Sequence, residues 1–509
     1  MSFRFAVPEL DADQAADFSP RQLGLLIREV EQAPAPEAAR LLNGWLCLAN
    51  RSPARTDDRL RALESLLPTA KTTLDELAAV YEVGSLPLTG PFRDAATVAR
   101  SIQLELGYGF KRVLMEHTQK LTAEGQKALP FLLCRAMREL ADTLVTAYCT
   151  YCPTPSGIWQ EIHHIFHYAQ FYGLDNSLVE DFGGHPSTTL GAIYREVLLF
   201  ALMDPYHLQP GEARTVLELV SHFQRLLVVE PYRDVSHTDG VFLIQASQDK
   251  PPRPLAASGG VVISPMDKLL DTGRLVAELG ATRRRSESGD SAELTLIPVA
   301  EGRGALHALL ARLERHWTSP PRRGANRKTG GHDVAVAIGI PLVAGAVAAG
   351  RGDLTTQLEN WQVANESPGG FALRRDGPIA SDVTVGEVVA ILHPEVDEWQ
   401  PGIVRWVHDR QDQLMECGVQ LLAPTCQVVS LQPAGAESGP PRLGLRLPEV
   451  PALNRPPLLL AARGTFQAGR EWGLDGAHGR QRARAVRLDD HTYQVDVFEF
   501  EILEGAAGV

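Results

Sequence analysis

The sequence predicts a multidomain α+β protein with an N-terminal all-α helical domain, a small α/β linking module, an antiparallel β-barrel and a small C-terminal β subdomain. Three observations support this prediction. The length of 509 residues suits about three domains. Apolar residues recur at helical spacing in the first half of the chain and alternate at strand spacing in the second half. Segments rich in proline and glycine separate these regions.

Composition narrows the class of protein. A hydrophobic content of 44% with 22% charged residues is typical of a folded globular protein. The net charge of -13 argues against general binding to nucleic acid or to a membrane surface, because both require a basic field. The six cysteines do not form the disulfide framework of a secreted protein, and the N-terminal residues have no apolar signal segment. We therefore expect a soluble, cytoplasmic protein.

Residues 20–235 are predicted to form the helical domain, preceded by a flexible N-terminus of residues 1–19. Apolar side chains recur every three or four positions, as at Leu133 and Met137, between breaks of proline and glycine. We expect about eight to ten helices in antiparallel hairpins. Helical arrays of this size often present a surface to another protein, so this domain is predicted to bind a protein partner that the sequence does not identify.

Residues 236–318 are predicted to form the α/β linking module. Short apolar strands alternate there with two helical stretches, near residues 266–279 and 305–317. Between these stretches, the arginine triplet of residues 283–285 leads into a serine-rich run. We interpret the triplet as a solvated, mobile loop, because charge runs are usually exposed.

Residues 319–432 are predicted to form the barrel, and residues 433–509 a linker with a small C-terminal β subdomain. Alternating apolar residues near 388–392 and 403–407, separated by turns with glycine or proline, predict strands. The apolar stretch 334–350 is interpreted as a buried strand, because it is short for a membrane span and contains proline and glycine. We therefore expect no transmembrane segment.

Two polar segments of the barrel region carry the candidate binding chemistry. A guanidinium pairs bidentately with phosphate or with the O6/N7 edge of guanine, and it stacks on aromatic faces. Asparagine and serine offer short hydrogen-bonding groups, and glycine permits close approach of the backbone. The plainer interpretation is a solvated basic linker followed by an ordinary turn. The candidate residues are Arg322, Arg323 and Arg327 in the first segment, and Asn365, Ser367 and Gly370 in the second.

Together and in this order, the two segments resemble the PilZ domain, the bacterial receptor for cyclic di-GMP. The pattern of that family is Arg-x-x-x-Arg, a strand, and then [Asp/Asn]-x-Ser-x-x-Gly. Arg323 and Arg327 match the first part, and residues 365–370 match the second. One departure is Asn365, where aspartate is the commoner residue. The resemblance extends through later strand-like segments to about residue 430.

The resemblance implies a six-stranded barrel and a non-catalytic receptor, with cyclic di-GMP as the ligand and no cofactor or metal. It implies that the arginines clamp phosphate and read or stack on guanine, and that Asn365, Ser367 and Gly370 bind the other face of a base. An extra arginine before the motif, here Arg322, implies that the ligand can bind as an intercalated dimer. Control of motility, pili or biofilm formation is the usual output of the family.

Two other functions remain open from the residues alone. The protein could be a ligand-independent scaffold whose barrel is degenerate and whose helical domain binds a partner. It could also be a metal hydrolase using His163, His164 and His167, which lie at helical spacing. Against an enzyme, the sequence has no nucleophile elbow, Walker loop or dinucleotide fingerprint. Cys149 and Cys152 form a CxxC pair without a partner pair, and we interpret them as packing thiols.

Overall fold

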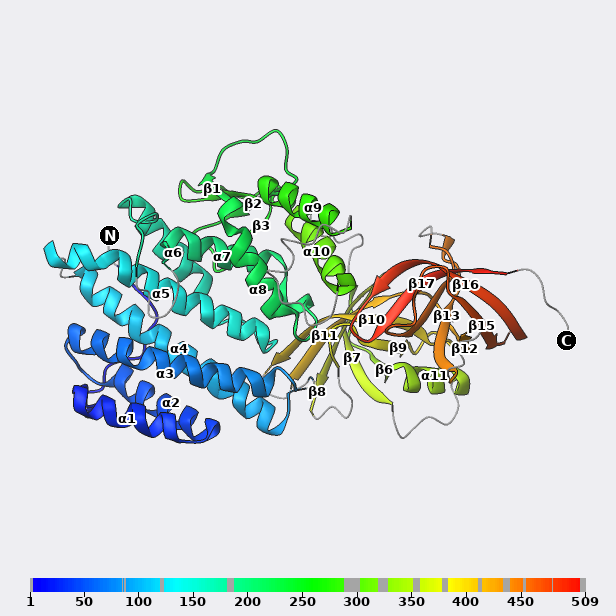
Figure 1. Ribbon diagram of the computed structural model, residues 1–509, viewed down its shortest axis with the longest axis horizontal. Coiled ribbons are helices and arrows are strands. Elements are labelled where there is room, and N and C mark those ends of the chain that lie inside the picture. The colour runs from blue at the N-terminus through cyan, green and yellow to red at the C-terminus, as the bar shows by residue number, and fades with distance from the viewer. Residues whose placement is uncertain are drawn as a thin grey trace. The chain divides into compact units, whose positions relative to one another are not determined.

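A computed structural model of the chain defines two compact units (Figure 1). Unit 1 contains Met1–Gly84, Leu88–Pro205 and Gly211–Arg322, and unit 2 contains Ser85–Pro87, Tyr206–Pro210 and Arg323–Val509. The structure describes residues 3–84, 86, 88–119, 123–180, 187–287, 303–318, 328–350, 358–377, 383–410, 414–433, 440–451, 455–477 and 479–503.

Unit 1 opens with a helical array, which confirms the predicted all-α domain. Its helices are α1 (Pro20–Gln32), α2 (Ala35–Arg51), α3 (Thr56–Tyr81), α4 (Gly90–Gln119), α5 (Ala123–Cys149), α6 (Ile158–Phe171), α7 (Leu190–Leu202) and α8 (Glu212–Phe223). Side-chain caps mark the starts of two helices: the Ser19 hydroxyl of α1 accepts a hydrogen bond from the Gln22 amide, and Thr189 caps α7 in the same way. Helix α4 packs against both α3 and α5, so its buried residues lie at the centre of the array.

The N-terminal segment differs from the expectation of a flexible end. Phe3 and Phe5 are buried and stack with their ring centroids 4.8 Å apart. The carbonyl oxygen of Pro8 accepts a hydrogen bond from Arg112 in α4. Residues 3–8 are therefore held against the helices, because the two phenylalanines bury apolar surface there, whereas most of residues 9–19 are exposed.

Helix α5 carries charged groups into the interior of the array. Arg135 is paired with Glu64 at 3.0 Å, and Glu139 accepts a hydrogen bond from the Gln103 amide at 2.8 Å. Burial, together with the nearby Asp142 carboxylate, raises the pKa of the Glu139 carboxyl to about 8. Glu139 therefore binds its proton more tightly in the folded than in the unfolded chain.

This raised pKa predicts that the helical array loses stability as the pH rises. The contribution of Glu139 is fully present below the unfolded pKa of about 4.5 and is lost as the pH rises through about 8. We expect the free energy of unfolding to fall by an amount on the order of a few kcal/mol across this window. Glu139→Gln should flatten the dependence, whereas the exposed Glu31→Gln should not. Urea unfolding followed by helical circular dichroism checks this, and identical slopes in all three proteins would contradict it.

The α/β module follows the helices within unit 1. Its elements are β1 (Val228–Pro231), β2 (Val241–Ile244), β3 (Arg253–Pro254), β4 (Lys268–Asp271), α9 (Gly273–Glu287) and α10 (Arg303–Thr318), with the strands in the order β1-β4-β2-β3. Trp317 is fully buried and donates a hydrogen bond to the Leu199 carbonyl of α7, which attaches the module to the helical array.

Two details of the module differ from the prediction. Strand β1 begins at Val228, before the expected boundary at residue 236, because it pairs with β4 rather than continuing the helices. The triplet of residues 283–285 lies in α9 and not in a loop. Arg283 forms an ion pair at 3.1 Å with Glu314 of α10, so at least one charge of this basic run is paired on the neighbouring helix.

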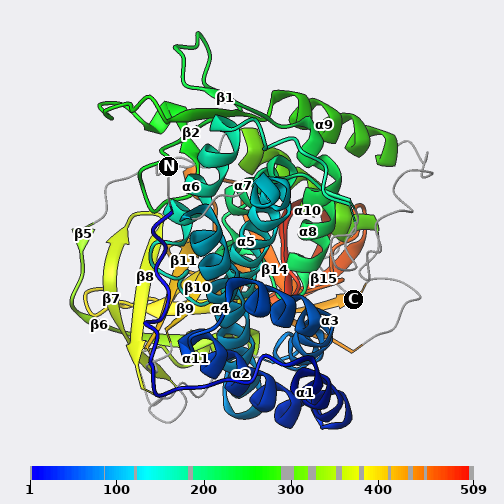
Figure 2. The same cartoon turned by 90° about the vertical axis from the view of Figure 1, so that its left-hand side faces the viewer.

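The first barrel of unit 2 confirms the predicted six-stranded antiparallel barrel. Its elements are β5 (Lys328–Thr329), β6 (Asp333–Ile338), α11 (Ile340–Ala349), β7 (Glu359–Ser367), β8 (Gly370–Asp376), β9 (Val388–Leu392), β10 (Gln400–Arg410) and β11 (Leu414–Leu421). The ring runs β7-β6-β9-β10-β11-β8 and closes by the β7–β8 pairing, while the short β5 pairs with β7 (Figure 2).

The apolar stretch 334–350, expected as one buried strand, is a strand and a helix. Strand β6 ends at Ile338, and Gly339 turns the chain with a φ of 85°. Pro341 then occupies the first turn of α11, where its fixed φ and missing N–H favour a helix start. Alternating valine and alanine suit either structure, so the pattern alone did not separate them.

The predicted C-terminal β subdomain is a second closed barrel. Its strands are β12 (Gln427–Pro433), β13 (Arg442–Leu447), β14 (Leu458–Ala462), β15 (Glu471–Gly476), β16 (Gly479–His491) and β17 (Val495–Ile502), closed in the order β12-β13-β14-β17-β16-β15. The predicted bounds of the first barrel, 319–432, include most of β12. Strand β12 belongs to the second barrel because it pairs with β13. The proline-rich segment between them therefore joins two strands of one barrel and does not link two domains.

The two barrels share one hydrophobic core. Val343 and Ala346 of α11 are buried together with Val388 of the first barrel and with Leu445 and Leu460 of the second. This common core makes the barrels one compact unit. Among the helices that the structure describes, none has the length and hydrophobicity needed to cross a membrane.

Candidate cyclic di-GMP site

The motif of residues 365–370 forms the tight connection between β7 and β8. Ser367 pairs with Gly370 across the hairpin, and the Ser367 hydroxyl donates a hydrogen bond to the Gly370 carbonyl at 3.3 Å. A Cβ atom at Gly370 would lie 2.0 Å from the Val419 carbonyl oxygen of β11. Only glycine fits this close approach between two backbones. Gly370 thus has a structural reason for its presence besides its place in the motif.

Asn365 has an unsatisfied acceptor next to this hairpin. Its Oδ1 atom is buried and has no hydrogen-bond partner among the described residues. The residue lies at a bulge, where the register between β7 and β8 shifts after Val363. A buried acceptor without a partner costs about 1–3 kcal/mol, so such groups usually indicate a ligand or an ordered water.

Strand β5 connects the basic segment to this hairpin. Thr329 pairs with Asn365, and Lys328 pairs with Glu366. The Gly330 amide donates to the Ala364 carbonyl at 3.1 Å, and a Cβ at Gly330 would lie 2.3 Å from the Val363 oxygen. Glycine therefore lets the chain run close against β7 at this point.

The structure brings Asn365, Ser367 and Gly370 together, as the sequence predicts. Arg322, Arg323 and Arg327 lie outside the described residues. Along the chain, Arg327 directly precedes Lys328, the first residue of β5. The contacts of the three arginines remain a prediction.

Family models match three regions of the chain. A model described as "Cyclic-di-GMP receptor FimW, N-terminal domain" matches residues 21–233. The FimW middle PilZ domain matches residues 348–427, and the FimW C-terminal beta-barrel domain matches residues 426–503. The chain belongs to the cyclic-di-GMP receptor FimW family. The PilZ match begins after β6, so the arginine segment and β5 precede the matched residues.

A curated relative supports the FimW assignment over the whole chain. The cyclic-di-GMP receptor FimW of Pseudomonas aeruginosa strain PAO1 is 22% identical over 574 aligned residues. The alignment covers 99% of this chain and 94% of the relative. No solved structure matches the chain significantly.

The histidines of α6 do not form the alternative metal site in this FimW-family chain. His163 is buried, and its two ring nitrogens are hydrogen-bonded to the Tyr194 hydroxyl at 2.8 Å and to the Lys250 carbonyl at 3.0 Å. Burial lowers the pKa of His163 to about 4. Neither nitrogen is available to a metal, and His163 serves packing. Cys149 and Cys152 are not joined in a disulfide, and the Cys152 thiol accepts a hydrogen bond from Arg100 at 2.9 Å.

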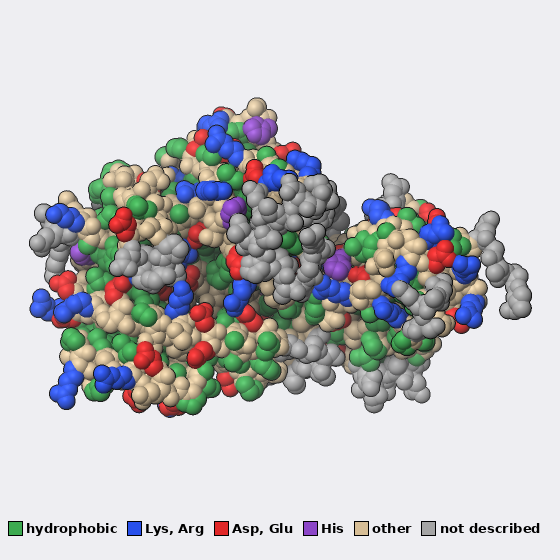
Figure 3. Space-filling model, viewed as in Figure 1, with side chains coloured by type: hydrophobic (Ala, Val, Ile, Leu, Met, Phe, Trp, Pro, Cys, Tyr) green, Lys and Arg blue, Asp and Glu red, His purple; other side chains and the backbone are tan. Residues whose placement is uncertain are grey.

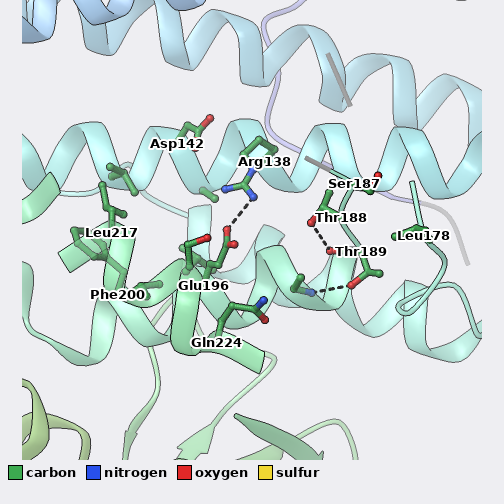
Figure 4. Close-up of a pocket in the computed structure, with 16 residues that line it drawn as sticks. Arg138, Asp142, Leu178, Ser187, Thr188, Thr189, Glu196, Phe200, Leu217 and Gln224 are labelled. Carbon is green, nitrogen blue, oxygen red and sulfur yellow. Dashed lines mark hydrogen bonds and ion pairs between the residues drawn. The ribbon is translucent and has the colours of Figure 1, made fainter. Parts of the chain in front are cut away.

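A cavity of about 530 Å³ lies in the helical domain between α5, α7 and α8 (Figure 4). Arg138 points towards Glu196 within it, and the two form an ion pair at 2.9 Å. Apolar side chains such as Phe200 and Leu217 form much of the remaining wall. Because the arginine is already paired with an acid, the cavity has no strong charge preference for an anionic nucleotide.

The surface charge is mixed. On the face shown in Figure 3, lysines and arginines are interspersed with acidic and hydrophobic side chains. The described side chains on this face therefore form no continuous basic field. An anionic ligand would have to be recognised at a local site, such as the one beside β5.

Sequence reasoning missed three side chains near this site, His332, Glu366 and His393. They lie within reach of one another although they come from separate strands or their flanks. No spacing in the sequence points to them, because they meet only when β6, β7 and β9 align. The available signal in the sequence was that His332 lies just before one predicted strand and His393 just after another.

Proposed function

We propose that this FimW-family chain is a non-catalytic receptor that binds cyclic di-GMP at the end of the PilZ barrel marked by Asn365, Ser367 and Gly370. The observation that carries the proposal is the buried Oδ1 of Asn365, which has no partner among the described residues. A guanine edge offers N–H donors that satisfy this acceptor. The FimW receptor of Pseudomonas aeruginosa, aligned over nearly the whole chain, is named for the same nucleotide.

The phosphates of the nucleotide would be bound by Arg322, Arg323 and Arg327. Guanidinium groups bind phosphate bidentately and stack on bases, which lysine does less well. Lys328 pairs with Glu366, and Thr329 pairs with Asn365. The residues that directly follow the basic segment therefore lie beside the Asn365 hairpin. Two nucleotides bound as an intercalated pair fit the three arginines.

Ligand binding would be communicated along the chain itself. Residues 319–327 join α10 of unit 1 to β5 of unit 2. Arginines that close on a nucleotide restrict this connection, and the helical domain would present the change to a protein partner. The proposed compartment is the cytoplasm, where the six cysteines, none of them in a disulfide, stay reduced.

Hydrogen exchange tests this communication. We expect cyclic di-GMP to slow amide exchange in residues 319–332 by at least about tenfold, because nucleotide contacts would order that segment. GMP at the same concentration serves as the control. Protection confined to the barrel strands, with none in residues 319–327, would show that the connection does not respond to the ligand.

Asn365→Ala separates ligand binding from folding. Removal of an unsatisfied buried acceptor should leave stability unchanged or slightly higher, whereas loss of one base contact should weaken cyclic di-GMP binding by about tenfold. Asn360→Ala, an exposed position on the same strand, should change neither. Calorimetric titration and thermal unfolding of both variants check this. A large loss of stability in Asn365→Ala with unchanged affinity would mean that Asn365 is structural.

A further inference from the structure

We propose that His332, Glu366 and His393 form a binding site for a divalent transition-metal ion, zinc in particular, at the edge of the PilZ barrel. The potential ligand atoms of the three side chains all lie within 4.8 Å of one another. Two imidazoles and one carboxylate are a ligand set that zinc uses where a fourth position stays open to water. The proposal is independent of nucleotide binding.

The barrel topology brings the three residues together. Strand β6 lies between β7 and β9 and is antiparallel to both. The start of β6 and the ends of β7 and β9 therefore share one edge of the barrel. His332 directly precedes β6, Glu366 is the penultimate residue of β7, and His393 directly follows β9.

The backbone holds His332 in place at this edge. Its carbonyl oxygen accepts a hydrogen bond from the Val363 amide of β7 at 2.9 Å. The close approach of Gly330 to Val363 fixes the preceding turn against the same strand. The His332 side chain is therefore presented from an ordered strand entry, as a preorganised metal site requires.

The contacts among the three side chains leave room for a metal ion as their common partner. The Nε2 atom of His393 lies 3.8 Å from a carboxylate oxygen of Glu366, too far for a good hydrogen bond. The Nε2 atom of His332 is buried without a hydrogen-bond partner among the described residues. Zinc bonds of about 2.0–2.2 Å at tetrahedral angles place ligand atoms about 3.4 Å apart. Small side-chain movements would close the present spacing to this value.

The rings of the two histidines also face each other closely. Their centroids are 4.5 Å apart at an interplanar angle of 71°. All three side chains are half-buried, so an ion between them would be partly shielded while water could still reach a fourth position. A carboxylate beside two neutral imidazoles attracts a divalent cation more than an anion.

One proton must move within His393 for zinc to bind. Its Nδ1 atom accepts a hydrogen bond from the Glu395 amide at 3.1 Å, so in the neutral ring the proton is on Nε2. Coordination through Nε2 transfers that proton to Nδ1 and leaves the ring neutral. The Glu395 amide then loses its acceptor, and the turn after β9 must adjust. Zinc binding should therefore change hydrogen exchange at Glu395.

The test is zinc titration of the tag-free full-length protein after removal of metal with a chelator. Competition against a chromophoric zinc indicator should show one tight site per chain. Loss of a residue that only hydrogen-bonds to a metal ligand typically weakens metal binding by about tenfold to hundredfold. Because Glu366 and His393 are proposed as direct ligands, Glu366→Gln and His393→Gln should each weaken zinc binding by more than this. His164→Gln, an exposed histidine on α6, should bind as the parent does. Magnesium in excess should not compete.

A spectroscopic probe identifies the ligands directly. Cobalt bound in place of zinc should give the visible absorption of a four-coordinate site in the parent protein, and lose it in Glu366→Gln. Thermal unfolding of the metal-free variants shows whether they fold. If His393→Gln does not fold, the test rests on Glu366→Gln, which keeps the shape of the side chain. Lack of a tight site in the parent, or unchanged binding in a folded Glu366→Gln variant, would overturn the proposal. The assay contains no nucleotide, so its failure would not affect the cyclic di-GMP assignment.

Discussion

The double variant Arg323→Ala/Arg327→Ala is expected to lose at least about 3 kcal/mol of binding free energy for cyclic di-GMP, which is about a hundredfold in affinity. In the proposed site, each guanidinium would supply charge-assisted, bidentate contacts to phosphate. Calorimetric titration at fixed salt concentration measures the loss. Thermal unfolding should stay close to that of the parent, because the proposed contacts are made to the ligand.

The control for this variant removes the same charge elsewhere. Arg21 and Arg28 are exposed on α1, and Arg21→Ala/Arg28→Ala makes the same change in net charge. It should bind the nucleotide as the parent does. Equal losses of affinity in the two double variants would mean that overall charge, and not a specific arginine clamp, governs binding. Retained affinity in Arg323→Ala/Arg327→Ala would place the phosphate contacts on other residues.

Gly370→Ala is expected to destabilise the PilZ barrel by at least about 2–3 kcal/mol. The new Cβ would lie 2.0 Å from the Val419 carbonyl oxygen, a backbone atom that cannot rotate away. Strand β8 would have to separate from β11 where Gly370 pairs with Gln420. The hairpin that carries Asn365 would move with it, so nucleotide affinity should fall as well. Tryptophan fluorescence during urea unfolding measures the loss of stability.

Gly369→Ala provides the matched control in the same turn. Nothing lies within 4 Å of a Cβ at Gly369, and its backbone does not require glycine. This variant should be close to the parent in both stability and affinity. If Gly370→Ala were equally harmless, β8 and β11 would be further apart than the structure has them, and the close approach would not explain the glycine of the motif.

Local patterns in the sequence predicted most of the architecture. Helical periodicity identified the N-terminal domain, and alternating strands with the two polar segments identified the PilZ barrel. The hairpin of Asn365 and Gly370 was predictable because the motif and the turn occupy six consecutive residues. Information of this kind depends on neighbours along the chain, which is why a single sequence reveals it.

Features decided by distant partners were not predictable. Strand β12 pairs with β13 and β15, and only this pairing assigns it to the second barrel. Arg283 of α9 pairs with Glu314 of α10, a contact that no local pattern indicates. His332, Glu366 and His393 meet only through the order of three strands. The roles of Arg322, Arg323 and Arg327 rest on the sequence motif, since these residues lie outside the described residues.

The most direct test of the central claim is calorimetric titration of the full-length protein with cyclic di-GMP, with GMP as a control. The receptor assignment predicts micromolar or tighter binding of cyclic di-GMP, with one nucleotide or an intercalated pair per chain, and much weaker binding of GMP. Absence of heat and of binding at high nucleotide concentration would contradict it. The barrel would then be a degenerate PilZ domain, and the helical domain would act as a scaffold that does not respond to the nucleotide.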